Sequence, residues 1–189
     1  KVLRESLWQI TVAVYDGKQI KGVWPGQKET IFGLAVDVGS TTLSAQLCNL
    51  KTGKVIASAG TMNPQIRFGE DLMSRVSYLM MNPDDMTDMT REVRTAINYL
   101  AAQTTNEVGS DPSNIVDVVL VGNPIMHHIL LGIDPTELGG APFALATDMA
   151  LNITAEELDL YFNPSATAYI LPCIAGHVGA DTAAVILAH

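Results

Sequence analysis

Apolar and polar positions alternate over several short stretches in the first third of the chain, a pattern typical of half-buried strands. Residues 31–37 form a nearly continuous apolar run, 43–50 alternate, and 55–61 form a third stretch after a Lys-Thr-Gly-Lys turn. Short turns between neighbouring strands allow antiparallel pairing. We therefore expect three consecutive antiparallel strands in this part of the chain.

A separate pair of strands is expected before them. Residues 8–15 alternate between apolar and polar side chains, and Asp16-Gly17 is a dipeptide typical of hairpin turns. Pro25-Gly26 and a polar stretch then separate this pair from the rest of the chain. We expect residues 1–30 to be the end of a linker or of a preceding domain, and residues 31–189 to form one mixed α/β domain.

The spacing of apolar residues becomes helical after residue 69. Residues 70–80 and 88–109 both repeat apolar side chains three and four positions apart, and Asn82-Pro83 separates the two stretches. Two helices are therefore predicted here. The first is expected to place five apolar side chains on one face: Leu72, Met73, Val76, Leu79 and Met80.

The remainder of the chain predicts further strands that alternate with helices. Strands linked by helical crossovers pair in parallel, so the later strands should extend the sheet in that direction. The overall order is β-β-β-α-β-α-β-α with two extra short helices. The expected elements are a strand over 115–121, helices over 125–131, from 134 and over 156–162, a strand over 168–174 and a helix over 181–187.

Composition and charge narrow the class of protein. With 48% hydrophobic residues among 189, the chain can bury a real core, which excludes intrinsic disorder. A net charge of −9 argues against nucleic acid or an anionic membrane as the main partner. No apolar run approaches the roughly 18 residues of a membrane-spanning helix, and we expect a cytoplasmic protein without a signal peptide.

The segment from Asp37 to Thr42, Asp-Val-Gly-Ser-Thr-Thr, carries the clearest chemistry. A tight turn at Gly39 between two strands can direct successive backbone N–H groups at an anion, and the next three residues add hydroxyl donors: Ser40, Thr41 and Thr42. Asp37 is suited to holding Mg²⁺ through water. The alternative is a structural turn followed by a Thr-rich strand entry.

This loop and the order of elements resemble the superfamily of actin, the sugar kinases and the heat-shock chaperone ATPases. In that superfamily the loop is called phosphate-1 and holds the end of the nucleotide. The resemblance implies a ribonuclease H-like, actin-type half-domain whose last strand and helix border the nucleotide cleft. It makes Asp181 the candidate acidic residue that orients water or metal near the attacked phosphate; a carboxylate that only stabilises a helix N-terminus is the alternative.

Three further strings make the resemblance more specific. Together with the loop they are similar to the ATPase domain of reductive activators of corrinoid-dependent methyltransferases, a family in which many members are named only as ferredoxin-like iron–sulfur proteins. The resemblance covers about residues 31–189. The strings are Asn63-Pro-Gln-Ile-Arg-Phe-Gly-Glu-Asp71 with Ser74-Arg75, Val121-Gly-Asn-Pro-Ile-Met-His-His128 with Leu131-Gly-Ile-Asp-Pro135, and Gly176-His-Val-Gly-Ala-Asp181.

The resemblance implies the function of a longer protein. Family members join a 2Fe–2S ferredoxin-like domain, a linker and this ATPase, and use ATP to help drive electrons onto cob(II)alamin of a corrinoid protein or methyltransferase subunit, which restores cob(I)alamin. The implied ligands of the ATPase are ATP and Mg²⁺. Cys48 and Cys173 cannot supply the four thiolates of a cluster, so the cluster would belong to the longer protein, a candidate homodimer, and not to this chain.

The chain is accordingly expected to be the first half of an actin-like ATPase domain, with little ATPase activity alone. Two alternatives stay open: a small-molecule kinase or hydantoinase-like ATPase on the same fold, and a non-catalytic module that docks a partner.

Five further residues are candidates for contact with the nucleotide or the partner. Asn123 follows a parallel strand, where such sheets bind ligands, and His177 lies in the expected cleft loop. The resemblance places Arg67, Glu70 and Asp71 beside the cleft. Helix capping, packing and surface ion pairs are the structural alternatives.

Two adjacent histidines in the second string, His127-His128, are expected to serve packing and capping. Neighbouring side chains on a helix diverge by about 100°, so the pair is ill suited to share one metal.

Overall fold

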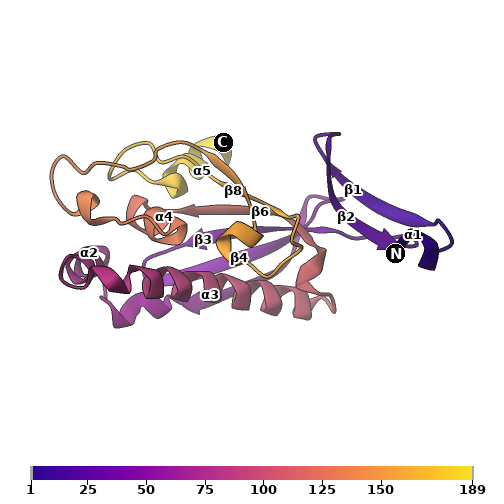
Figure 1. Cartoon of the computed structure of the whole chain (residues 1–189), viewed down its shortest axis with the longest axis horizontal. Helices are drawn as coiled ribbons and strands as arrows, with labels where there is room; N and C mark the ends of the chain where they lie inside the picture. The colour runs from indigo at the N-terminus through magenta and orange to yellow at the C-terminus, as the bar shows by residue number, and fades with distance from the viewer. Residues whose placement is uncertain (1, 189) are drawn as a thin grey trace.

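The computed structural model describes residues 2–188 and contains two separate sheets. A six-stranded sheet forms the body, and a two-stranded hairpin projects from one end of it (Figure 1). The expected units were residues 1–30 and 31–189. Lys1 of the first and His189 of the second lie outside the described residues.

The three-stranded antiparallel unit forms as predicted. Strands β3 (Phe32–Val38), β4 (Thr42–Asn49) and β5 (Lys54–Met62) follow one another along the sheet, and Asp37 pairs with Ser44. On β3 and β4 burial alternates, because successive side chains of a strand point to opposite faces. One face of the sheet therefore belongs to the core.

The later strands extend the sheet on the other side of β3. Strand β6 (Ile115–Gly122) pairs with β3 in parallel, and β8 (Thr167–Ile170) pairs with β6 in parallel. The sheet order is β5-β4-β3-β6-β8-β7. Its first five positions have the three antiparallel and two parallel strands of the expected ribonuclease H-like fold, so the predicted fold class is confirmed.

Helices cover the core face of the sheet. Helix α3 (Met86–Glu107) packs along β4 and β5, and α4 (Pro124–Leu131) packs against α3 (Figure 1). Helix α2 (Leu72–Met81) precedes them, whereas α5 (Ala180–Ala188) lies beside β6 on the opposite face. The apolar side chains that α3 buries most completely follow helical spacing: Met89, Val93, Ile97, Leu100 and Ala101.

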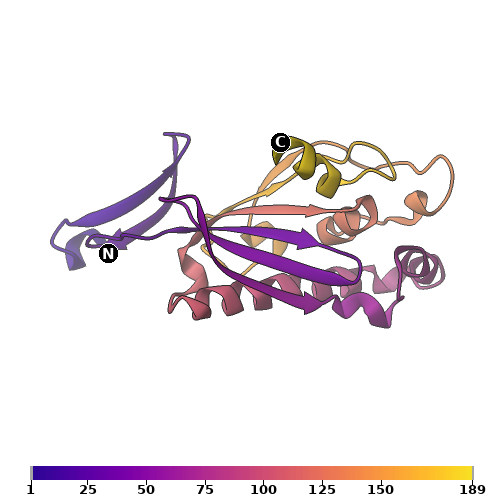
Figure 2. The same ribbon diagram turned by 180° about the vertical axis from the view of Figure 1, so that it is seen from behind.

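The opposite face of the sheet remains partly open. In the reverse view β3, β4 and β5, in purple, lie in front with no helix over them (Figure 2). Exposed residues of β3 and β4 on this face are Ala35, Asp37, Thr42, Ser44 and Gln46. A shallow cavity of about 310 Å³ lies here between β3, β4, β6 and α5. Asp37 lines this cavity at the end of β3.

Several expected elements in the second half are shorter than predicted. The expected helices after 134 and over 156–162 are single 3-10 turns, Thr136–Gly139 and Glu156–Leu158. The Glu157 carboxylate accepts hydrogen bonds from the backbone N–H and the hydroxyl of Thr154 just before the second turn. Asp159 then adopts a left-handed backbone conformation with φ 52°, which ends the turn.

The sheet has one strand that the sequence pattern did not indicate. Strand β7 (Leu151–Thr154) pairs with β8 in an antiparallel direction at the sheet edge. The last strand was predicted over 168–174 but ends at Ile170, and Leu171 begins a long loop to α5. Four residues give too short a run for alternation to distinguish a strand from a loop.

The predicted apolar face of α2 is only partly buried. Val76 and Leu79 enter the core, whereas Met73 and Met80 are exposed. The buried position next to Val76 is taken by a charged residue, Arg75, whose side chain is 0% exposed.

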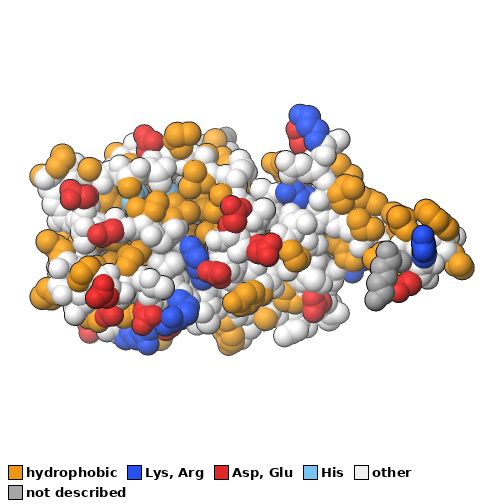
Figure 3. Space-filling model, viewed as in Figure 1, with side chains coloured by type: hydrophobic (Ala, Val, Ile, Leu, Met, Phe, Trp, Pro, Cys, Tyr) orange, Lys and Arg blue, Asp and Glu red, His pale blue; other side chains and the backbone are white. Residues whose placement is uncertain are grey.

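The hairpin consists of β1 (Ile10–Tyr15) and β2 (Gln19–Pro25), preceded by a short helix α1 (Val2–Glu5). Asp16 and Gly17 have positive φ angles at its turn, as the Asp-Gly dipeptide predicted. Apolar side chains lie along its surface (Figure 3). Leu7 and Trp8, between α1 and β1, are 85% and 73% exposed. Across residues 2–188, no helix combines the length and the hydropathy that crossing a membrane requires.

Candidate nucleotide-phosphate site

The loop that joins β3 to β4 is fixed by hydrogen bonds that other parts of the protein donate to its carbonyl groups. Asn63 contacts the loop twice, because its Nδ2 donates to the Gly39 oxygen at 2.9 Å and its backbone N–H donates to the Thr41 oxygen at 2.8 Å. Between these contacts, Nη2 of Arg75 donates to the Ser40 oxygen at 2.6 Å. Three successive carbonyls of the loop are therefore directed toward the protein.

The direction of these carbonyls decides where the N–H groups point. In a planar trans peptide the N–H lies opposite to the C=O of the same unit. The N–H groups of Ser40 and Thr41 are therefore turned away from Asn63 and Arg75, and neither donates to any acceptor within residues 2–188. Successive N–H groups without acceptors are the arrangement that binds anions such as phosphate.

Gly39 is required at the start of this loop. A Cβ atom at position 39 would lie 2.4 Å from the backbone oxygen of Thr42, well inside van der Waals contact. Because the contact is with backbone, no change of rotamer could relieve it. The close approach of the two strand ends, rather than an unusual φ angle, accounts for the glycine.

Asp37 and Asp181 come from distant parts of the chain and interact electrostatically. The pKa of Asp37 is raised, first by partial burial at the end of β3 and second by the negative charge of Asp181. Asp37 lines the open cavity beside α5, and Asp181 lies in the first turn of α5. The structure thus brings together the two acidic residues that the sequence indicated.

Close backbone packing places α5 and Asp181 at this edge of the sheet. A Cβ at Gly179 would lie 2.5 Å from the Gly122 oxygen and 2.6 Å from the Cα of Asn123. The loop before α5 therefore rests directly on the end of β6, and only glycine allows this approach.

Asp37 and Asp181 supply the carboxylate oxygens that a Mg²⁺ ion bound together with a phosphate group would need. Within the described part of the chain, no three His, Cys, Asp or Glu side chains are grouped as a self-sufficient metal site. Mg²⁺ in nucleotide sites needs only one or two carboxylates, because water and phosphate oxygens fill its other positions. Asp37 and Asp181 are the residues that could hold it.

Asn123 has a structural role in the observed state. Its side-chain oxygen accepts a hydrogen bond from the Met126 N–H at 3.0 Å, which caps the N-terminus of α4. His177, in the loop before α5, packs its ring against Phe143 with centroids 4.1 Å apart. Both residues therefore have the structural contacts named as alternatives.

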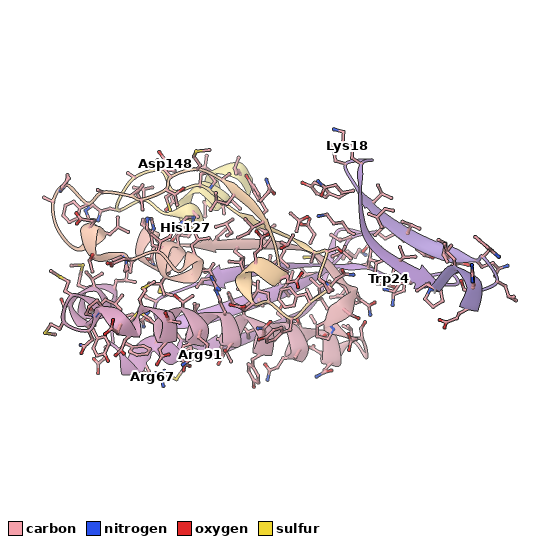
Figure 4. The ribbon with its side chains drawn as sticks, in the orientation of Figure 1. Lys18, Trp24, Arg67, Arg91, His127 and Asp148 are labelled. Carbon is pink, nitrogen blue, oxygen red and sulfur yellow. The ribbon has the colours of Figure 1, made fainter. Side chains whose placement is uncertain are left out.

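Arg67, Glu70 and Asp71 lie where β5 leads into α2. Arg67 forms an ion pair with Glu92 of α3 at 2.7 Å, and it lies at the outer edge of the body together with Arg91 (Figure 4). Asp71 and Ser74 form a reciprocal capping box at the start of α2. Glu70 is exposed.

Sequence reasoning missed the contributions of Asn63 and Arg75. Both residues stand in the motif strings, yet no role was assigned to them. The available signal was the position of Arg75: it lies among the apolar residues of α2, at a buried helical position where an unpaired charge is costly. A charged residue at such a position indicates a specific set of hydrogen-bond acceptors.

The two adjacent histidines lie in the core of the body. His128 is fully hydrogen-bonded: Nδ1 contacts the Pro124 oxygen at 2.8 Å, and Nε2 accepts from the Ala146 N–H at 3.0 Å. His127 is 2% exposed, neither ring nitrogen has a hydrogen-bond partner among the described residues, and burial lowers its pKa to about 4 (Figure 4). A neutral packed ring matches the expected structural role.

The sequence of residues 32–189 matches the family described as RACo middle region. The chain belongs to this family. The chain is also similar to the corrinoid activation enzyme RamQ of Eubacterium limosum, with 29% identity over 184 residues, which cover 97% of the chain and 31% of RamQ. The RACo middle region therefore begins at β3, and the hairpin precedes it.

A solved structure agrees with this assignment. The fold matches a reductive activator for a corrinoid, iron–sulfur protein with a TM-score of 0.86 and 34% identity, over 98% of the chain and 30% of the activator. The chain thus spans about a third of the length of the relatives that it matches.

Proposed function

We propose that this RACo middle region is part of an ATP-dependent reductive activator of corrinoid proteins, in which it binds the phosphate end of ATP. The observation that carries the proposal is the hydrogen bonding of the β3–β4 loop. Asn63 and Arg75 donate to the carbonyls of residues 39–41, and the N–H groups of Ser40 and Thr41 have no acceptors within residues 2–188. Relatives named as a corrinoid activation enzyme and a reductive activator support the wider function.

The residues of the site would have separate tasks. The backbone N–H groups of Ser40 and Thr41, with the hydroxyls of residues 40–42, would bind phosphate oxygens. Asp37 and Asp181 would hold Mg²⁺ through water, and Asp181 would also orient the attacking water. Their mutual repulsion disfavours two bare carboxylates and favours a bound divalent cation, which stabilises the developing charge in phosphoryl transfer.

The proposed coupling to the corrinoid protein is thermodynamic. ATP can favour reduction of a corrinoid partner only if the nucleotide-bound and nucleotide-free states of the activator have different affinities for that partner. The 2Fe–2S cluster, the second half of the ATP site and the corrinoid contacts would all belong to the longer protein. Alone, the 189-residue chain would bind the nucleotide weakly and hydrolyse it little.

Two measurements test the proposal. In the 189-residue chain, ¹⁵N NMR titration with ATP·Mg²⁺ should shift the amide resonances of residues 39–42 before others. In the longer protein, ATP hydrolysis should rise when the Co(II) form of the corrinoid partner is added. Reactivation of that partner at the same rate without ATP would contradict the proposal.

A matched control tests whether the amide shifts come from this site or from nonspecific binding of the nucleotide. Asp111 is an exposed carboxylate that caps a 3-10 turn before β6, at the other end of that strand from Asn123. Asp111→Asn should leave the nucleotide-induced shifts unchanged, whereas Asp37→Asn should weaken the effect of Mg²⁺ on them.

A further inference from the structure

Arg75 of α2 is a buried cation that forms no ion pair within residues 2–188, although the charge of Asp71 four positions earlier acts on it. Its side chain is 0% exposed, and no described Asp or Glu lies within ion-pair distance of it. Its guanidinium donates only to neutral acceptors, which are the oxygens of Ser40, Gly69 and Gln65 and the sulfur of Met126. A buried cation without an ion pair is costly unless its N–H groups are satisfied by other acceptors, and these four contacts supply such acceptors.

These contacts join segments that are distant in sequence. Gln65 accepts from Arg75 Nη1 at 3.3 Å and donates its own Nε2 to the Met89 oxygen at 2.8 Å, which anchors the guanidinium to α3. The shortest contact of Arg75, at 2.6 Å, is the one to the Ser40 carbonyl of the loop. The guanidinium of Arg75 therefore makes its closest contact with the Ser40–Thr41 peptide group of the candidate phosphate site.

That peptide group connects Arg75 with the phosphate side of the loop. The Ser40 carbonyl and the Thr41 N–H belong to one planar unit and point in opposite directions. A charged donor on the carbonyl polarises the unit, and polarisation strengthens the opposite N–H as a donor. Arg75 thus increases the positive potential at the Thr41 N–H without reaching the site.

We infer that Arg75 is a positioning residue that fixes and polarises the Ser40–Thr41 peptide for an anionic ligand of the phosphate class. The identity of the ligand in this inference rests on the proposed function. The effect of Arg75 on the orientation and polarity of the Ser40–Thr41 peptide does not. Asn63 assists by holding the carbonyls on either side, those of Gly39 and Thr41.

The first test compares Arg75→Lys with Arg94→Lys. Arg94 is a suitable control because its guanidinium also donates to a backbone carbonyl, that of Leu130, and lies on α3 away from the loop. A lysine cannot reproduce the several directed contacts of Arg75. Arg75→Lys should move the ¹⁵N and ¹H resonances of the Thr41 amide and raise the Kd for ATP·Mg²⁺ at least about fivefold, whereas Arg94→Lys should do neither.

The second variant, Gln65→Glu, keeps the size of the side chain and gives Arg75 a carboxylate partner, but it loses the hydrogen bond from Nε2 to the Met89 oxygen. Gln65→Met loses the same hydrogen bond without adding a charge and is the matched control. If Arg75 has only a structural role, the two variants should have the same ATP affinity. If its charge polarises the loop, the new carboxylate should offset that charge, shift the Thr41 amide and weaken ATP·Mg²⁺ binding. This variant also decides the question if Arg75→Lys does not fold.

The outcomes separate the inference from the proposed function. The positioning role is overturned if Gln65→Glu, and Arg75→Lys where it folds, keep the Thr41 resonances and the ATP affinity of the wild type. If the wild-type chain and the longer protein bind no ATP·Mg²⁺, the proposed function fails. The Thr41 amide shifts in the same variants would then still confirm or overturn the role of Arg75 in the loop.

Discussion

The negative charge of Asp181, in the first turn of α5, raises the pKa of Asp37 at the end of β3. Partial burial of Asp37 is the larger cause of the raised pKa, and the charge of Asp181 adds to it. The two carboxylates lie at the same edge of the sheet because the loop before α5 rests on the end of β6, which is parallel to β3. The repulsion between two such charges would be relieved by a bound cation.

The first prediction concerns this pair. Asp181→Asn removes one charge and should lower the pKa of Asp37, as measured by ¹³C NMR titration of its carboxyl carbon. Burial is the larger cause, so the pKa should remain above its ordinary value. An unchanged Asp37 pKa would show that the two carboxylates do not interact in solution.

Substitution of Asp37 should also affect stability. A carboxyl whose pKa is raised on folding binds more protons in the folded state, so its ionisation opposes folding above the unfolded-state pKa of about 4. Asp37→Asn should therefore raise the melting temperature at pH 7 by about 1–2 °C, and the difference should disappear as the pH falls below about 4. Thermal melts at both pH values provide the measurement.

Gly39→Ala should disrupt the β3–β4 loop while the core stays folded. The added Cβ meets the Thr42 backbone oxygen at 2.4 Å, so the loop must move and its N–H groups must change direction. We expect at least about a tenfold loss of ATP·Mg²⁺ affinity with a small change in melting temperature. Gly140→Ala serves as a glycine control for affinity, because an added Cβ there meets nothing within 4 Å and the φ angle of −150° is an extended one that alanine adopts.

Asp71→Ala should reduce stability without changing nucleotide binding. It removes the capping box with Ser74 at the start of α2, which typically costs about 1 kcal/mol in the free energy of unfolding. Denaturant titration and ATP·Mg²⁺ binding can be measured on the same sample. A loss of ATP·Mg²⁺ affinity in a fully folded variant would show that Asp71 contributes to nucleotide binding.

His127 should make the chain less stable in acid. Its pKa falls to about 4 on folding, below the ordinary value of 6.5, mainly through burial, so the unfolded state binds the extra proton between these values. Stability should consequently decrease as the pH falls from about 6.5 toward 4. His127→Leu should remove part of this dependence and raise the melting temperature at pH 4.5 by on the order of 5 °C relative to wild type. Equal pH dependence in both proteins would contradict the assignment.

Local sequence was sufficient wherever an element has enough residues to show its period. The alternating strands β3 to β5 and the long helix α3 follow directly from the spacing of apolar residues, because each buries one face. The Asp-Gly turn of the hairpin is equally local. Strand β7 and the 3-10 turns are too short for this signal, and they form where the neighbouring strand β8 and the loop backbone allow.

The site was only half determined by sequence. The residues from Asp37 to Thr42 identify a possible anion-binding loop, and the motif strings include Arg75 and Asp181. Whether the loop directs its N–H groups outward depends on Asn63 and Arg75 binding its carbonyls from behind, and whether the two acids meet depends on how closely α5 approaches β6. These are contacts between residues far apart in the chain, so only the tertiary structure could decide them.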